Sequence, residues 1–191
     1  GYVSIFAAQY YGAGVNERVG PSIWQGAYIA LGGAFVHLLL IPLAPTIFDL
    51  VGHDPEVRRY EVIYFQILCF GAFPGIATSA FSGFFTGLGR PWPVMWVNLL
   101  ATGVNLLLDY ILIFGKWGFP EMGIEGAASA TVVAGFVYCI AYLALLARPA
   151  LRRTFHTLSG WRFEGALFLR LLRFGFPSGV QFFVDIAGFT I

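Results

Sequence analysis

Long apolar runs alternate with short polar segments along the chain. Because an α-helix rises about 1.5 Å per residue and the hydrocarbon core of a bilayer is about 30 Å thick, a membrane span needs about 20 mostly apolar residues. Four runs reach that length: Trp24–Leu50, Glu61–Leu88, Pro93–Gly115 and Met122–Ala147. The pattern therefore predicts four transmembrane helices.

Two shorter apolar runs flank these spans. Gly1–Tyr11 is too short to cross a bilayer, and Phe174–Ile191 is still apolar at its last residue. The chain starts with glycine, and no initiator methionine or charged leader precedes the first run. We interpret both runs as parts of further spans, and we expect the chain to be a fragment of a longer protein.

Composition agrees with a membrane protein. Of the 191 residues, 58% are hydrophobic and 11% are charged, whereas an ordinary soluble domain has about 25% charged residues. The predicted fold class is all-α, a polytopic transmembrane helix bundle. The net charge of +1 is too small to indicate a nucleic-acid partner. Cys69 and Cys139 lie within apolar runs, far from other sulfur or imidazole ligands, so we expect neither a disulfide nor a metal site.

The basic residues predict the orientation of the spans, because cytoplasmic loops of membrane proteins are enriched in arginine and lysine. Of the 11 basic residues, the larger group lies in alternate connections: Arg18, Arg90, Arg148, Arg152, Arg153, Arg162, Arg170 and Arg173. The remaining connections contain Arg58, Arg59 and Lys116. We therefore expect the first group to face the cytoplasm.

The connection from Arg148 to Arg173 supplies most of this basic charge. Its apolar and basic residues also recur at helical spacing, at Phe163, Leu167, Arg170, Leu171 and Phe174. This spacing is typical of an amphipathic helix that lies on a membrane surface. A lipid-binding element and a plain interdomain linker are both compatible with it.

One predicted span carries a polar face. Asn98, Asn105 and Asp109 are separated by seven and four residues, so at about 100° per residue they fall within about 40° of one another. Insertion of an ionised aspartate near the centre of a span costs about 2.5 to 3.5 kcal/mol, and such residues normally face protein or water. Asp109 is therefore a candidate proton or cation site. The alternative is a buried, protonated acid that donates to a backbone carbonyl.

Other polar residues within apolar runs give weaker signals. Asp185 follows Gln181 by one helical turn and forms a second candidate acid. We interpret His37 as a packing residue, and Thr131 in GAASAT as a residue that packs or bonds to its own backbone. The glycines of GLGRPW resemble a phosphate loop, but they lack the strand-then-helix context that a nucleotide site needs.

Several segments together carry a family resemblance. They are AAQYYGAG, SGFFTGLGRPWPVMWVNLLATGVNLLLDYILIFG, GFPEMGIEGAASAT and, after a basic loop, FGFPSGVQFFVD. In this order they resemble the multidrug and toxic compound extrusion (MATE) family. The resemblance implies a partial amino-terminal lobe of a twelve-helix, two-lobe transporter, running from late in the second helix into the seventh. The implied divisions are 1–147 for the lobe, 148–173 for a cytoplasmic interlobe linker and 174–191 for the start of the carboxy-terminal lobe.

The resemblance also implies a function: export of amphipathic, often cationic small molecules in exchange for H⁺ or Na⁺ by alternating access. Asn105 and Asp109 match the family's cation site and could hold Na⁺, Thr131 is a weaker match, and Asp185 stands where another branch has a glutamate. Further residues are candidates for the substrate cavity: Asn98, Gln181 and Gln9. We expect a non-enzymatic, multi-pass protein of the inner (plasma) membrane, monomeric at full length, with no organic cofactor.

Two other functions compete with this interpretation. A lipid-linked precursor flippase of a related superfamily would line its cavity with cationic side chains for phosphate, whereas no arginine or lysine lies inside the four complete spans. An intramembrane aspartyl protease also needs two acids on different helices. Its two carboxylates must approach closely enough to share a proton, and Asp185 lacks the glycine-containing signature expected of the second acid.

Overall fold

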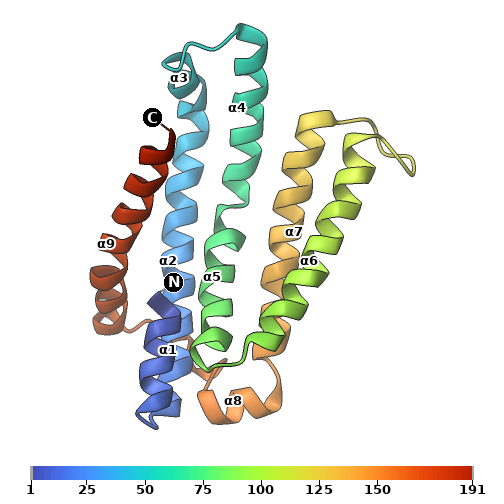
Figure 1. Cartoon of the computed structure of the whole chain (residues 1–191). Helices are drawn as coiled ribbons and strands as arrows, with labels where there is room; N and C mark the ends of the chain where they lie inside the picture. Colours follow the sequence, from blue (N-terminus) through green and yellow to red (C-terminus); the bar gives the residue numbers. More distant parts are fainter. Residues whose placement is uncertain (1, 191) are drawn as a thin grey trace. The chain divides into compact units, whose positions relative to one another are not determined.

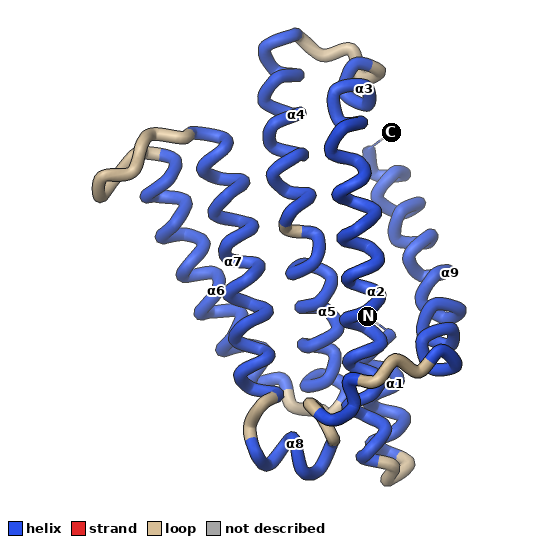
Figure 2. The backbone as a smooth tube through the Cα atoms, turned by 180° about the vertical axis from the view of Figure 1, so that it is seen from behind, coloured by secondary structure: helices blue, strands red, loops and turns tan. Residues whose placement is uncertain are grey.

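The computed structural model describes residues 2–190, apart from the side chains of 182, 183 and 186–190, and within that range the regular structure is helical (Figures 1 and 2). The α-helices are α1 (Tyr2–Gly12), α2 (Val19–Leu40), α3 (Ala44–Asp49), α4 (Pro55–Phe70), α5 (Ala72–Gly87), α6 (Pro91–Ile113), α7 (Gly123–Leu146), α8 (Pro149–Phe155) and α9 (Gly165–Thr190). Short 3₁₀ turns lie at Asn16–Arg18, Ile41–Leu43 and Ser159–Trp161. The all-α fold class is confirmed.

The membrane spans agree in number with the hydropathy pattern. Within residues 2–190, three helical stretches are long and apolar enough to cross a bilayer: Asn16–Asp49, Pro91–Ile113 and Gly123–Leu146. The pair α4 and α5 forms a fourth span if the two helices are counted together. The chain is thus a multi-pass membrane protein.

The span expected at Glu61–Leu88 is broken rather than continuous. Helices α4 and α5 meet at Gly71 with a bend of 47°. Pro74 lies in the first turn of α5, where its missing N–H does no harm, whereas inside a continuous helix its ring would clash with the carbonyl of residue 70. The Gly71 amide instead donates to the Leu68 carbonyl at 2.8 Å, which closes the last turn of α4.

The chain divides into two compact units. Unit 1 contains Gly1–Ile29, Ser79–Pro91 and Leu145–Ile191, and unit 2 contains Ala30–Thr78 and Trp92–Ala144. This division differs from the sequence-based boundaries at 147/148 and 173/174, which describe lobes of a longer protein and stay predictions. The eight basic residues assigned above to the cytoplasmic connections all belong to unit 1, and Arg58, Arg59 and Lys116 belong to unit 2.

Small residues let helices approach closely in unit 1, as is usual for membrane helices. A Cβ atom on Gly26 of α2 would lie 2.7 Å from a methyl carbon of Val3 and 2.8 Å from the Cβ of Ala80. A Cβ on Gly87 of α5 would lie 2.8 Å from the Cβ of Ala7. Helix α1 therefore packs against both α2 and α5 at glycine positions.

Unit 2 is assembled in the same way. A Cβ on Gly126 of α7 would lie 2.7 Å from the carbonyl carbon of Leu112 on α6, and a Cβ on Gly135 would lie 3.3 Å from the ring of Pro74. Helix α7 thus packs against α6 on one side and against the start of α5 on another. These contacts position the polar residues of α6 and α7.

The amphipathic segment expected between Phe163 and Phe174 is not a separate helix. Helix α9 runs from Gly165 to Thr190 without a break at Phe174, although Pro177 lies inside it. Leu167 and Leu171 are 2% exposed, so these two leucines face the interior of unit 1. The apolar side of the pattern is used for protein packing over this part of α9.

Candidate functional site

The polar face of α6 keeps the alignment that its spacing predicts. Asn105 and Asp109 are half-buried, whereas the side chain of Asn98 is exposed. Helix α6 runs unbroken from Pro91 to Ile113, so Asn105 and Asp109 are separated by one helical turn on the same face.

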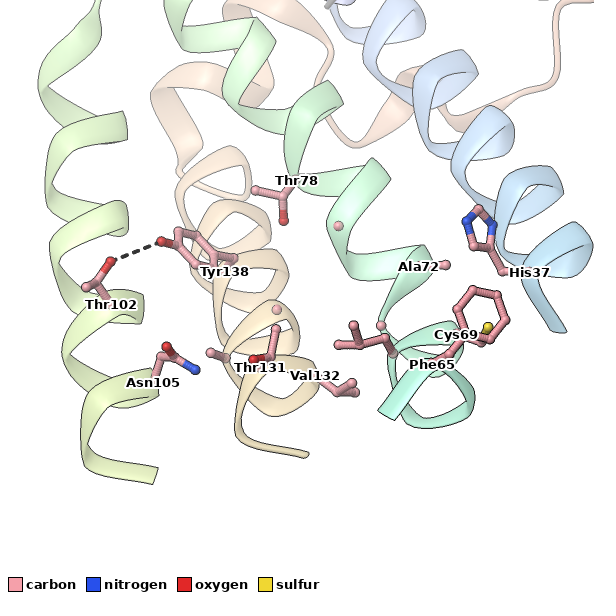
Figure 3. A pocket seen from close by; sticks show the side chains of 15 residues that line it. His37, Phe65, Cys69, Ala72, Thr78, Thr102, Asn105, Thr131, Val132 and Tyr138 are labelled. Carbon is pink, nitrogen blue, oxygen red and sulfur yellow. Dashed lines mark hydrogen bonds between the residues drawn. The ribbon is translucent and has the colours of Figure 1, made fainter. Parts of the chain in front are cut away.

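A cavity of about 590 Å³ opens within unit 2 (Figure 3). Its wall is formed by His37 of α2, by Phe65, Leu68 and Cys69 of α4, by Gly71, by Ala72, Gly75 and Thr78 of α5, by Thr102 and Asn105 of α6, and by Thr131, Val132, Ala134, Gly135 and Tyr138 of α7. The volume is within the range typical of small-molecule sites, which is about 300 to 1,000 Å³. Most of the lining is apolar, with a few polar side chains.

Asn105 and Thr131 both line this cavity, although they are far apart in the sequence. The amide of Asn105 points from α6 toward α7, on the side where Thr131 lies (Figure 3). The Thr131 hydroxyl donates to the Ala127 carbonyl of its own helix at 3.0 Å, as the packing interpretation expected. The oxygen of that hydroxyl keeps its acceptor capacity, so Thr131 both bonds to its own backbone and lines the cavity.

Asp109 lies one turn beyond Asn105 and outside the set of residues that line the cavity. Among residues 2–190, no hydrogen bond or ion pair reaches its carboxylate, and in particular Asn105 does not donate to it. Its role as a proton or cation site stays a prediction. Its orientation by Asn105 stays a prediction.

Thr102 and Tyr138 are polar cavity residues that the sequence reasoning missed. The Tyr138 hydroxyl lies 3.3 Å from the Thr102 hydroxyl (Figure 3). It also donates to the Asn98 carbonyl at 3.4 Å. Thr102 lies between Asn98 and Asn105 on the polar face of α6, so counting threonine as polar would have found it. Tyr138 follows Thr131 by seven residues on α7, which is the same helical face.

His37 also lines the cavity, whereas its sequence context indicated only packing. The Nδ1 atom of its ring lies 2.8 Å from the Gly33 carbonyl oxygen. Because a carbonyl oxygen only accepts hydrogen bonds, Nδ1 is the donor in this contact. His37 therefore bonds within its own helix, as a packing residue does, and still presents a polar group at the cavity wall.

The remaining predicted residues lie in unit 1. Gln9 is on α1, and Gln181 and Asp185 are on α9, and all three side chains are exposed. Their roles in transport stay predictions.

The thiols and the metal-ligand types form no site within the described part of the chain. Cys69 and Cys139 are free and buried, and the Cys139 thiol donates to the Pro74 carbonyl at 3.5 Å. Residues 2–190 contain no cluster of three or more histidine, cysteine or acidic side chains that could hold a metal ion.

Comparisons with known proteins agree with this architecture. The sequence pattern of the MatE family matches residues 3–111. The probable multidrug resistance protein NorM of Geobacillus kaustophilus (strain HTA426) is 30% identical over 191 residues, which covers 98% of this chain and 42% of the relative. The probable multidrug resistance protein NorM of Rhodopseudomonas palustris (strain ATCC BAA-98 / CGA009) is 31% identical over 184 residues, which covers 92% of this chain and 37% of the relative. The chain thus spans about two fifths of the length of these relatives.

A solved structure shares the fold. The inward-facing conformation of a multidrug resistance MATE family transporter of the MOP superfamily superposes with a TM-score of 0.78 at 24% sequence identity, over 92% of this chain and 39% of that chain. The membership of a transporter family disfavours the intramembrane protease considered above. The match to residues 3–111 extends over more than half of the 191 residues, and it shows that the chain belongs to the MATE family of multidrug transporters.

Proposed function

We propose that the full-length protein containing this chain is a secondary active antiporter, which exports amphipathic, often cationic compounds in exchange for H⁺ or Na⁺. The cavity of unit 2 is the observation that carries the proposal. Asn105 lies in the cavity wall, and Asp109 lies one helical turn further along the same face of α6. An apolar pocket with few polar groups suits an amphipathic molecule. A carboxylate close to such a pocket suits a cation.

The cavity wall has groups for both parts of an amphipathic cation. Phe65 and Tyr138 offer aromatic faces, which attract organic cations as well as apolar rings. The hydroxyls of Thr102 and Tyr138 and the amide of Asn105 supply hydrogen-bonding groups. The lining contains no arginine or lysine, so it is not built to bind the phosphates of a lipid-linked precursor.

Exchange follows from competition for one negative charge. Ionised Asp109 attracts either an organic cation or the coupling ion, and binding both at once adds repulsion between them. Loading the coupling ion therefore weakens substrate binding when the site faces outward. Release of that ion to the cytoplasm restores the negative charge and recruits the next substrate. Each ligand shifts the equilibrium between the two conformations only through its different affinity for them.

The residues present are compatible with either coupling ion. A proton needs only the Asp109 carboxylate. Sodium needs several oxygen ligands, which the Asp109 carboxylate, the Asn105 amide oxygen and the Thr131 hydroxyl could supply.

The test is substrate efflux by the full-length protein from proteoliposomes under an imposed H⁺ or Na⁺ gradient. Asp109→Asn keeps the size of the side chain and removes its charge, so we expect gradient-driven efflux to fall to the level of protein-free liposomes. Asn105→Ala leaves the carboxylate in place, and we expect it to weaken efflux less completely.

Asp54→Asn is the matched control, because Asp54 is exposed and caps α4 by accepting from the Glu56 amide at 2.9 Å. Asparagine makes the same cap, so this variant should export as the wild-type protein does. Wild-type efflux by a monodisperse Asp109→Asn protein would show that Asp109 is structural. The proposed role of its charge would then be wrong.

A further inference from the structure

The segment that joins α8 to α9, residues 156–164, is held against the start of α2. The chain crosses α2 on its way between the two helices (Figures 1 and 2). Trp24 of α2 donates from its indole Nε1 to the Thr157 carbonyl at 2.7 Å, and the hydroxyl of Tyr28 donates to the Trp161 carbonyl. We call residues 156–164 the strap.

Gln25 makes the most specific of these contacts. Its side chain is fully buried at 0% exposure. Its Nε2 donates to the Arg162 carbonyl at 3.1 Å, and its Oε1 accepts from the Glu164 amide at 3.4 Å. One side-chain amide thus pairs with a C=O and an N–H of the strap, as a neighbouring peptide group would. Loss of this amide leaves two backbone groups of the strap without their partner, which is costly where water is excluded.

Packing adds to these hydrogen bonds. A Cβ on Gly160 would lie 2.7 Å from the backbone nitrogen of Pro21, so the strap approaches α2 more closely than a side chain would allow. Thr157 is 1% exposed, and its hydroxyl donates to the Leu146 carbonyl at 2.6 Å. The Arg18–Glu164 ion pair at 3.1 Å adds little, because both side chains are substantially exposed.

A flexible linker between domains is solvated and makes few contacts, and this strap has neither property. Three residues within the first ten positions of α2 bind its backbone, so the strap holds the start of α9 beside this part of α2. We propose that Gln25, supported by Trp24 and Tyr28, is a positioning residue for transport, which fixes the start of α9 to α2 during each cycle. This inference rests on the proposed antiport function.

Gln25→Leu in the full-length protein removes both amide bonds at nearly constant volume. Gln66→Leu is the matched control, because Gln66 also donates from Nε2 to a backbone carbonyl, that of Ile41 at 3.1 Å, but in unit 2. Two quantities are measured: amide hydrogen exchange of residues 156–165, and the KM and Vmax of ion-driven efflux. We expect Gln25→Leu to speed exchange of the strap by about tenfold or more, since two hydrogen bonds to its backbone are lost.

The transport readout separates positioning from substrate binding. Gln25 is not among the cavity residues, so Vmax should fall several-fold while KM stays within about twofold of wild type. Gln66→Leu should leave strap exchange and Vmax unchanged. Tyr28→Phe removes only the hydroxyl bond to Trp161, and it should give a smaller change of the same kind even if Gln25→Leu does not fold.

Three results would overturn the inference: unchanged strap exchange in both α2 variants, faster exchange with unchanged Vmax, or a change confined to KM. A wild-type protein that shows no ion-driven efflux at all would instead refute the proposed antiport, and this inference would fall with it.

Discussion

Three glycines of α2 give a graded test of the helix packing. A Cβ on Gly26 would meet the Val3 methyl at 2.7 Å and the Ala80 Cβ at 2.8 Å. Aliphatic carbons normally approach to about 3.5 to 4.0 Å, so α1 and α5 would both have to yield by about 1 Å. Overpacking of this kind costs about 1 to 3 kcal/mol, and we expect Gly26→Ala to destabilise the protein by that amount.

Gly32→Ala is the matched control on the same helix. Nothing lies within 4 Å of a Cβ at Gly32, so the change removes only the conformational freedom of glycine and stabilises the helix by up to about 1 kcal/mol. Gly33 is the intermediate case, because its Cβ would meet only the end carbon of the Ile76 side chain at 2.7 Å, which can rotate away. Stability should therefore rank Gly32→Ala above Gly33→Ala above Gly26→Ala.

The assay is unfolding of the three full-length variants in detergent, followed by helix content and compared at equal protein concentration. We expect Gly26→Ala to lie about 1 to 4 kcal/mol below Gly32→Ala, as the sum of the lost packing and the gained propensity. Equal stability of these two variants, or the reverse order, would show that α1 and α5 do not meet α2 at Gly26 as described.

Two further predictions concern transport and topology. Asp185→Asn should reduce ion-driven efflux less than Asp109→Asn, because Asp185 is exposed on α9 whereas Asp109 is half-buried one helical turn from the cavity residue Asn105. Lost efflux in Asp185→Asn together with normal efflux in Asp109→Asn would show that Asp185, and not Asp109, is the coupling acid. Ser159→Cys and Glu121→Cys should react with an impermeant thiol reagent from opposite sides of the membrane, against a low background because Cys69 and Cys139 are each 3% exposed. Labelling of both from the same side would contradict the predicted orientation.

The spans could be predicted from the sequence because a bilayer imposes length and hydropathy on each helix separately. The break at Gly71 was also readable in principle, since Pro74 cannot continue an α-helix from the residues before it. A continuous run of apolar residues concealed it, because hydropathy does not report backbone geometry.

The candidate site was predictable only in part. The face shared by Asn105 and Asp109 follows from helical periodicity within one element. Tyr138 and the strap depend on contacts between elements: Trp24, for example, bonds to a carbonyl 133 residues further along the chain. Neither periodicity nor composition reports such pairings, and a backbone carbonyl acceptor leaves no mark in the sequence.

The most direct test of the antiport itself uses the wild-type full-length protein in proteoliposomes without any imposed ion gradient. A substrate gradient across the membrane should drive H⁺ or Na⁺ in the opposite direction, measured with a pH-sensitive dye or with radioactive sodium, and Asp109→Asn should abolish that ion movement. Substrate flux through the wild-type protein with no opposing movement of either ion would contradict the account.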